Sequence, residues 1–261
     1  MKEIEPVKPD IDAETVGDIK EFWTRNVNAE ELMGRRVSDH ERGNSAYFED
    51  LEAQRYRSHK HLKPWIEGMK PGHSVLEVGC GIGMDSHTMA IHGLGVTGID
   101  LTEVAVDTAR RRFQQEALPG TFQQGDATVL DFADESFDYV YSFGVLHHTQ
   151  NTEQSIREAY RVLKPGGEAR IMLYNRHSLN EFVHRLTRIP FEDADELCPV
   201  VRRFTRAEVR EMFSQFAEVE IHKDFVFGEG YGMVFKLTPA PLYRLLSRTL
   251  GWHLMIQARK A

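Results

Sequence analysis

Between about residues 74 and 174, short apolar runs alternate with amphipathic stretches. A short apolar run that ends at glycine or a turn predicts a buried strand, and apolar positions three and four apart predict a helix. Such alternation is typical of α/β proteins, in which helices connect the strands of a parallel sheet. The pattern predicts strands at 75–78, 95–100, 122–124, 137–142 and 169–174, helices at 86–92 and 102–115, and two later strands at 219–222 and 252–258.

The chain before this region has a helical pattern without strands. Residues 13–36 are helical but interrupted, and residues 47–62 form a further amphipathic helix. We therefore expect a helical cap at 1–67 and a main domain at 68–261. The apolar residues that anchor the second helix on the core are expected to be Phe48, Leu51 and Leu62.

Polar residues share that face of the second helix, and Tyr47 and Tyr56 lie near them. They either border a ligand pocket or belong to an ordinary amphipathic helix whose charged ends reach water.

The end of the chain has two features of its own. Residues 177–200 read as an insertion, with Phe191 and an acidic run at 192–196. A later helix begins near Pro239 and is both amphipathic and basic. Such a helix either lies on a membrane or covers the sheet, and we expect it to cover the sheet because the last strand must return beside it. Its apolar residues are Leu242, Leu245, Leu246 and Leu250, flanked by Arg244 and Arg248.

Three glycines at alternate positions follow the first strand in the pattern E-x-G-x-G-x-G, from Glu77 to Gly83. Without a Cβ, the chain turns sharply off the strand and lets a ligand approach the bare backbone, and N–H groups at the start of the next helix face the ligand. The dinucleotide fingerprint G-x-G-x-x-G would need a third glycine at position 84 or 86, where Met84 and Ser86 stand. The loop therefore predicts a nucleotide-like ligand but not a dinucleotide.

An acidic residue, Asp100, ends the second predicted strand 21 residues beyond Gly79. This is close to the spacing at which a carboxylate accepts hydrogen bonds from a ribose hydroxyl pair. The alternative is that Asp100 only caps the helix that starts near Thr102.

Four more segments follow in order: Gly125-Asp126-Ala127, a strand at 137–142, the run Phe143 to Thr149, and the turn Lys164-Pro165-Gly166-Gly167. With the glycine loop, they resemble the class I S-adenosylmethionine-dependent methyltransferases of the ubiquinone/menaquinone-biosynthesis-like (type 11) branch, over about residues 73–176. The resemblance implies a Rossmann-like, seven-stranded, mostly parallel sheet with an antiparallel last strand, and S-adenosylmethionine as the cofactor.

The resemblance also implies roles at matching positions. Glu77 meets the amino group of the cofactor, Asp100 meets the ribose, and Phe143 lies near the methionine part. The implied cofactor-binding set is Glu77, Gly79, Gly81 and Gly83 along the methionine and ribose, Asp100 and Leu101 at the ribose, Asp126 and Ala127 at the adenine, and Phe143.

The composition of the chain limits the classes of partner that it can bind. A net charge of −8 and a pI near 5.9 argue against nucleic acid, and 261 residues suffice for one elaborated domain. Two cysteines, Cys80 and Cys198, lack metal-ligand spacing, so we expect neither a disulfide nor a metal site. The N-terminus has no apolar signal-peptide core and the chain has no run of eighteen apolar residues, so we expect a cytoplasmic protein without a membrane span. The sequence leaves the oligomeric state open.

A sulfonium methyl group is already electrophilic, so the protein must mainly align the acceptor and exclude water. An acidic acceptor would also need a base, and histidine suits neutral pH. His147 and His148 follow the fourth strand and are the candidates, with His59 and His61 as weaker ones. Aromatic rings near the sulfonium would add cation–π stabilisation, and the candidates are Phe143, Tyr47, Tyr56 and Tyr174. The three tyrosines are also the candidates for acceptor binding.

Three hypotheses follow. The first is a methyltransferase for a small-molecule acceptor, whose pocket lies between the cap and the 177–200 insertion. The second is an enzyme that transfers or cyclises the aminocarboxypropyl arm of the same cofactor. The third is a non-catalytic cofactor-binding module, against which the intact Glu77, Asp100 and Asp126 argue.

Overall fold

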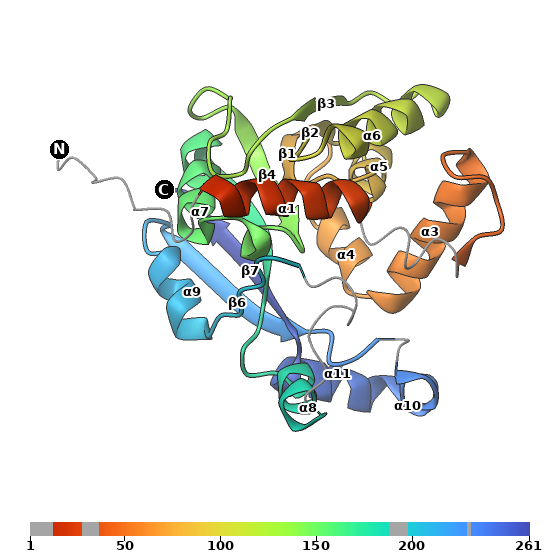
Figure 1. The fold of residues 1–261 in the computed structure, drawn as a ribbon. Helices are drawn as coiled ribbons and strands as arrows, with labels where there is room; N and C mark the ends of the chain where they lie inside the picture. Colours follow the sequence, from red (N-terminus) through yellow and green to blue (C-terminus); the bar gives the residue numbers. More distant parts are fainter. Residues whose placement is uncertain (1–12, 28–36, 188–197, 229–230) are drawn as a thin grey trace.

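A computed structural model describes residues 13–27, 37–187, 198–228 and 231–261, and these form one seven-stranded sheet flanked by helices (Figure 1). The strand order is β3-β2-β1-β4-β5-β7-β6, in which β7 runs antiparallel to both neighbours and every other pair is parallel. This confirms the predicted fold class. The strands are β1 Ser74–Val78, β2 Gly95–Asp100, β3 Thr121–Gln124, β4 Phe137–Phe143, β5 Leu163–Tyr174, β6 Glu218–Asp224 and β7 His253–Arg259.

Both faces of the sheet are buried, as expected of a parallel sheet covered by helices. Successive side chains alternate between the faces, so Val140 and Ile171 join one hydrophobic cluster while Tyr141 and Met172 join the other. The connecting helices are α5 Met84–Ile91, α6 Glu103–Gln115, the 3₁₀ turn η2 Leu146–His148, α7 Thr152–Val162 and α9 Arg206–Met212.

The N-terminal helices pack against the glycine-loop side of the sheet. Tyr47, Phe48 and Leu51 share a buried cluster with Ile82 and Met84, which lie in and after that loop. The division into a cap at 1–67 and a domain at 68–261 stays a prediction. The described helices before the sheet are α1 Ala13–Arg25, α3 Ser45–Ser58 and α4 Leu62–Glu67.

One sequence prediction for this region is wrong. The helix expected to run through Leu62 ends at Ser58, and α4 starts anew at Leu62. Pro64 explains the break, because proline has no N–H to donate and fits only the first turn of a helix. The break creates a short connection that carries His59 and His61.

Three helices gather at one end of the sheet, at the bottom of Figure 1: α8 Leu179–Thr187, α10 Met233–Leu237 and α11 Ala240–Leu250. Within the expected insertion the structure describes α8 and residues 198–200, whereas Phe191 and the acidic run at 192–196 lie outside the described residues. Among the parts of the chain that the structure describes, no helix has the length and apolarity to cross a membrane.

Helix α11 packs against β6, as expected of a helix that covers the sheet, but most of its leucines do not face the sheet. Tyr243 and Ser247 face the protein, where the Ser247 hydroxyl accepts from Val226 N at 3.2 Å and the Tyr243 hydroxyl donates to Phe227 O at 3.0 Å. The helix is held by these polar contacts, so its leucine side is left in solvent. We call the exposed side chains of the three helices the apolar face: Phe182 and Leu186 of α8, Met233, Val234 and Leu237 of α10, and Leu242, Leu245 and Leu250 of α11.

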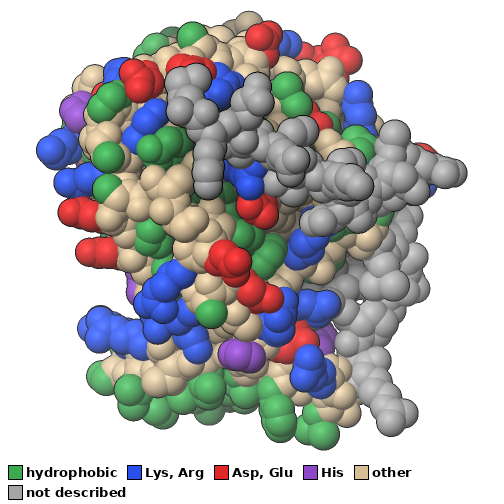
Figure 2. Space-filling view, turned by 90° about the vertical axis from the view of Figure 1, so that its left-hand side faces the viewer, with side chains coloured by type: hydrophobic (Ala, Val, Ile, Leu, Met, Phe, Trp, Pro, Cys, Tyr) green, Lys and Arg blue, Asp and Glu red, His purple; other side chains and the backbone are tan. Residues whose placement is uncertain are grey.

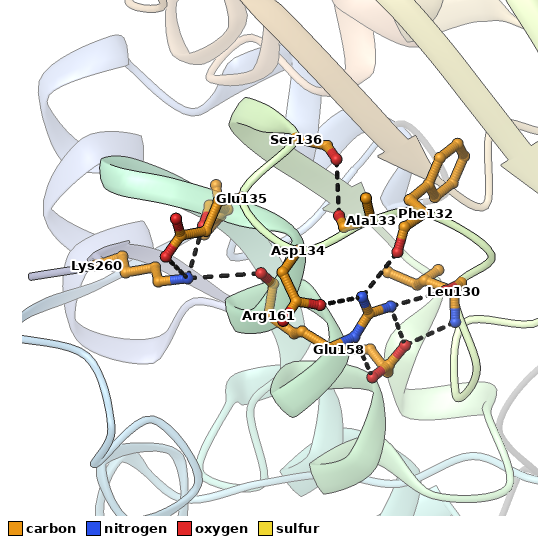
Figure 3. Close-up of polar contacts among 10 residues, drawn as sticks. Leu130, Phe132, Ala133, Asp134, Glu135, Ser136, Glu158, Arg161 and Lys260 are labelled. Atoms are coloured by element: carbon orange, nitrogen blue, oxygen red, sulfur yellow. Dashed lines mark hydrogen bonds and ion pairs between the residues drawn. The ribbon is translucent and has the colours of Figure 1, made fainter.

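A separate polar network fixes the loop before β4 (Figure 3). The Arg161 guanidinium of α7 donates to the carbonyls of Leu130 and Phe132 at 2.7 Å each, and pairs with Asp134 and Glu158. Glu158 in turn accepts from Leu130 N at 2.8 Å. The loop enters the sheet at the start of β4, so this network is structural and lies at the amino end of the parallel strands.

We expect Arg161→Ala to lower the free energy of unfolding by about 2 kcal/mol, because two carbonyls and two carboxylates lose a charged donor. Urea denaturation measures the change. Arg157→Ala is the matched control on the same helix, since Arg157 makes one i,i+4 pair with Glu153 and should cost less than about 0.5 kcal/mol. Equal effects for the two variants would contradict a bracing role for Arg161.

Candidate functional site

The candidate site lies between β1 and β4, where the strand order of the sheet reverses direction. β1 and β4 are neighbours, but the chain leaves β1 toward β2 and β3 and leaves β4 toward β5. Ligands of open α/β sheets bind beyond the carboxyl ends of the strands at such a switch point. The residues at this edge therefore define the candidate site.

The glycine loop turns directly off β1. Gly79, Gly81 and Gly83 have φ of +79°, +51° and +78°, a region that side-chain-bearing residues rarely adopt. Gly79 N and Cys80 N both donate to Ile99 O, at 2.8 and 2.9 Å, and so tie the loop to the end of β2. From the glycine pattern alone, these N–H groups could have been expected to bind a ligand. In the structure they donate to a backbone carbonyl of the protein instead.

Asp100 makes contacts with both the loop and the next helix. Its Oδ2 accepts from Gly81 N at 3.0 Å, and its Oδ1 accepts from Thr102 N and Thr102 Oγ1 at 2.9 and 3.0 Å. Burial raises the pKa of Asp100 above its usual value, although these donors oppose the shift. Asp100 therefore makes the contact with Thr102 that the capping alternative expects. A ribose hydroxyl would have to use the lone pairs that remain on Oδ2.

Two more acidic residues lie beside Asp100 on neighbouring strand ends. Glu77 is buried on β1, accepts from the Ser86 hydroxyl, and has a pKa well above its usual value because of burial and of the nearby Asp85 charge. Asp126 follows β3 and accepts from Thr128 N and Thr128 Oγ1 at 2.8 Å. This half of the edge is rich in acceptors, which suits a ligand that carries hydroxyl and amino donors and a positive charge.

Two other predicted cofactor residues lie on the same side. Leu101 follows β2 and its carbonyl accepts from Gln124 Nε2 at 2.8 Å, while Ala127 is buried next to Asp126.

A buried ion pair connects the cap to this edge, and the sequence did not single it out. Asp85, in the first turn of α5, accepts from Arg55 Nε at 2.8 Å, from the Tyr56 hydroxyl at 3.0 Å and from the Tyr141 hydroxyl at 2.8 Å. Burial alone would raise the pKa of Asp85, but Arg55 and the hydroxyl groups hold it below its usual value. The only sequence signal was that Arg55 shares a helix face with polar neighbours.

The other half of the edge carries rings. Phe143 ends β4, Phe225 follows β6 and His253 begins β7, and the break in the cap adds His59 and His61. Phe225 stacks on His59 and His253 with ring centroids 4.5 and 4.6 Å apart, and the His253 and His61 rings lie within hydrogen-bond distance at 3.2 Å. We call these five residues the histidine–aromatic cluster. The sequence pointed to His59, His61 and Phe143, but no local pattern indicated Phe225 or His253.

Phe225 also has an unusual backbone. Its φ is +59°, which costs of the order of 1–3 kcal/mol for a bulky residue and is tolerated only where the surroundings hold it. The stacking on two histidines is that support. Strained residues of this kind cluster at ligand sites.

The histidines of the cluster are uncharged at neutral pH. Burial, with the nearby Arg55 charge, lowers the pKa of His59 to about 3, and burial lowers that of His61 to about 4 despite Asp224. Burial and the other histidines place the pKa of His253 well below its usual value. The cluster is therefore a neutral, ring-lined surface.

We expect these shifts to make the fold sensitive to acid. Below pH about 6.5 the unfolded chain takes up protons that native His59 and His61 refuse until about pH 3 and 4, so stability is fully present above pH 6.5 and falls as the pH drops. The free energy of unfolding should decrease by about 2 kcal/mol or more between pH 7 and pH 5. His59→Phe keeps a stacking ring and should flatten this slope, whereas the exposed His40→Asn should not; equal slopes in denaturant titrations would contradict the explanation.

The two predicted catalytic histidines are buried next to Tyr174. His147 is fully buried with its ring 3.8 Å from Tyr174, and neither of its ring nitrogens has a partner in the part of the chain that the structure describes. Burial lowers its pKa well below the usual value. The Nδ1 atom of His148 lies 2.7 Å from Val200 O and close to Cys198. Of the two, His147 has ring nitrogens without a partner among the described residues, but both nitrogens are buried in this structure.

The three predicted acceptor tyrosines do not come together. Tyr47 lies in the buried cluster between cap and glycine loop, and the Tyr56 hydroxyl is held by Asp85 and Thr88. Tyr174 ends β5, between the rings of His147 and Trp252. Tyr174 is the one that faces the histidine–aromatic cluster, with its ring centroid 6.4 Å from that of His253.

A glycine loop, carboxylates near adjacent strand ends and a switch point together mark a Rossmann-like fold with a candidate ligand site at this edge. Residues 76–171 match the family described as "Methyltransferase domain". This region is therefore a methyltransferase domain, as the motifs within it predicted.

Curated relatives resemble this chain over that region. The sterol 24-C-methyltransferase ERG6B of Gibberella zeae is 38% identical over 125 residues, which are 47% of this chain and 33% of that protein. The ubiquinone biosynthesis O-methyltransferase of Coxiella burnetii is 33% identical over 106 residues, 41% of this chain and 45% of that protein. The chain thus spans between a third and a half of the length of these two relatives.

Solved structures extend the likeness to nearly the whole fold. An S-adenosylmethionine-dependent methyltransferase of Thermotoga maritima, a possible histamine N-methyltransferase, has a TM-score of 0.62 at 18% identity and covers 93% of this chain and 100% of its own. The [4+2]-cyclase SpnF has a TM-score of 0.60 at 16% identity and covers 93% and 94%. At these identities the likeness establishes the fold alone.

Proposed function

We propose that this protein is a methyltransferase that moves the methyl group of S-adenosylmethionine directly, in line, onto a small-molecule acceptor. The observation that carries the proposal is the division of the carboxyl edge at the switch point. Carboxylates occupy the β1, β2 and β3 side, neutral rings occupy the β4, β7 and β6 side, and Phe143 lies at the boundary.

The carboxylate side fits the cofactor. S-Adenosylmethionine carries a sulfonium charge, an amino group and ribose hydroxyls, all of which favour acceptors over donors. We assign Glu77 to the amino group, Asp100 and Leu101 to the ribose, and Asp126 with Ala127 to the adenine. Gly79, Gly81 and Gly83 allow close approach of the backbone, and Phe143 lies beside the methionine part.

When bound, S-adenosylmethionine supplies a methyl group on a sulfonium, an activated electrophile. The protein then has to orient the acceptor toward that methyl and keep water out. The Arg55–Asp85 pair supports this arrangement, because it fastens the cap to the first turn of α5 and the Arg55 guanidinium lies 5.2 Å from the centre of the Phe143 ring.

The ring side fits the acceptor. His59, Phe225 and His253 present parallel, uncharged rings, which favour a flat or apolar molecule over an ionic one. The matched relatives act at different atoms, carbon in one name and oxygen in the other, yet share only the region around the cofactor. The acceptor is therefore selected by residues outside 76–171, including His59, Phe225 and His253.

We propose His147 as the base where the acceptor must lose a proton, with His148 as the residue that positions it. Burial keeps the His147 imidazole neutral, so it has a lone pair to offer, and its ring nitrogens lack partners in the described structure. The two rings lie 4.3 Å apart, and the Val200 carbonyl orients His148.

A second candidate is chemistry other than methyl transfer, because the fold, which a [4+2]-cyclase shares, does not by itself determine the reaction. Transfer or cyclisation of the aminocarboxypropyl arm belongs to this group, and a non-catalytic cofactor-binding module is the remaining alternative. Each of these alternatives would bind the cofactor on the same carboxylates, so only the reaction products discriminate between them.

The experiment has two stages. Isothermal titration with S-adenosylmethionine and S-adenosylhomocysteine should show binding of both, and absence of binding would contradict the proposal. The protein is then incubated with methyl-deuterated S-adenosylmethionine and a small-molecule extract, and mass spectrometry follows the label. We expect S-adenosylhomocysteine and a labelled acceptor; methylthioadenosine would indicate arm transfer, and binding without any product would indicate a binding module.

A further inference from the structure

Exposed apolar side chains are concentrated in one place on this protein. Of the eleven large hydrophobic side chains that are exposed among the described residues, eight belong to the apolar face of α8, α10 and α11. They are between 40% and 73% exposed. Figure 2 shows hydrophobic side chains in a row along the lower rim, where these helices lie, with Lys and Arg just above them. Contiguous exposed apolar surface of this kind marks an interaction site.

The charge of the same helices is opposite to that of the whole chain. They carry Arg185, Lys236, Arg244 and Arg248, whereas the chain has a formal net charge of −8. Their only acidic residue is Glu181, which is buried and pairs with Arg185 and with Arg203. Arg244 and Arg248 are exposed and have no acidic partner in the described structure. The apolar face is therefore bordered by cations that are available to an anionic surface.

The three helices are held together and lie at the edge that carries the site. Tyr231 donates to Asn180 at 2.5 Å and so joins the start of α10 to α8, and Lys60 of the cap lies 5.4 Å from the centre of the Phe235 ring. Helix α8 follows the end of β5, α10 follows that of β6, and α11 leads into β7. The apolar face thus belongs to the same end of the sheet as the histidine–aromatic cluster.

We propose that the apolar face docks on the surface of a lipid bilayer that contains anionic lipids. Leucine and phenylalanine side chains would enter the boundary between headgroups and acyl chains, while Arg244, Arg248 and Lys236 meet the lipid phosphates, the arrangement of an interfacial amphipathic helix. A second copy of this chain fits the face poorly, because a two-fold interface would bring the same unpaired cations against each other. The charge pattern therefore selects an anionic, apolar partner.

The docking stands without the proposed function. Its extension, that the acceptor reaches the histidine–aromatic cluster from the bilayer, rests on the proposed function. An apolar acceptor would enter at the end of the sheet that faces the membrane, without crossing water.

The test is sedimentation of the full chain with vesicles of phosphatidylcholine alone and of phosphatidylcholine with phosphatidylglycerol, in low and high salt. We expect binding to the anionic vesicles that weakens as salt rises. Arg244→Gln with Arg248→Gln should weaken it about 30-fold, and Leu242→Gln with Leu245→Gln at least tenfold. Ile91→Gln with Val129→Gln is the matched control, since both residues are exposed elsewhere, and it should not change binding.

Several outcomes would overturn the proposal. These are no binding to anionic vesicles, equal loss in the Ile91/Val129 control, and a self-associated protein that the Leu242/Leu245 variant converts to monomer. The substituted leucines are exposed, so circular dichroism should show folded variants. The vesicle measurement needs no cofactor, so its failure is distinct from a failure of S-adenosylmethionine binding.

Discussion

Replacement of Asp100 by alanine is expected to weaken S-adenosylhomocysteine binding about 100-fold while the fold persists. A carboxylate at the end of β2 that accepts from two ribose hydroxyls would contribute two charge-assisted hydrogen bonds of about 1.5 kcal/mol each. Isothermal titration measures the affinity, and thermal unfolding followed by circular dichroism establishes that the variant is folded.

Asp100→Asn separates ligand binding from support of the loop. Asparagine keeps one oxygen that can accept from Gly81 N, the loop contact seen here at 3.0 Å, but loses the charge and half of the acceptors. We therefore expect near-native stability with affinity reduced at least tenfold. A folded alanine variant that binds as tightly as the native protein would refute the ribose assignment.

The second large effect concerns the first glycine of the loop. Gly79→Ala should lower the free energy of unfolding by about 3 kcal/mol or more, through positive φ and steric overlap. The φ there is +79°, and a Cβ would lie 2.2 Å from a γ-carbon of Val145, a stiff β-branched side chain. Chemical denaturation measures the loss, and we expect cofactor binding to fall with it because the loop must move.

Two variants divide this cost into its parts. Gly72→Ala has a similar φ, +83°, with nothing within 4 Å of the added Cβ, so it should cost only about 1 kcal/mol. Adding Val145→Ala to Gly79→Ala should recover part of the loss, in a double-mutant cycle with a coupling of about 1 kcal/mol or more. A Gly79→Ala variant no less stable than Gly72→Ala would show that the overlap does not matter.

The local elements of this fold could be predicted from the sequence because they depend on neighbouring residues. Apolar runs and their turns placed all seven strands, although β5 begins at Leu163, ahead of the predicted start at 169, and three glycines after β1 marked the loop whose positive φ values the structure shows. The acids near the ends of β1, β2 and β3 could be found in the same way, since each lies within two residues of the end of its own strand. Adjacent parallel strands then bring these acids together.

Helix ends and exposed faces were predicted less well. The helix assigned to 47–62 is divided before Pro64, and Leu242, Leu245 and Leu250 of α11 are exposed although their spacing is that of a core-facing helix. Periodicity shows that a helix has an apolar side, but not what covers it. That is decided by the partners of its other side, here Val226 and Phe227, which hold Ser247 and Tyr243.

The sequence by itself thus determined the class of fold, the glycine loop and the carboxylates Glu77, Asp100 and Asp126, because each depends on a pattern of a few consecutive residues. Only the tertiary structure decided the rest. Arg55 meets Asp85 across 30 positions of the chain, and His61 meets His253 across 192, so no local pattern links them. The same packing buries His147 and leaves the apolar face exposed, because the burial of a side chain depends on contacts with residues that are distant in the sequence.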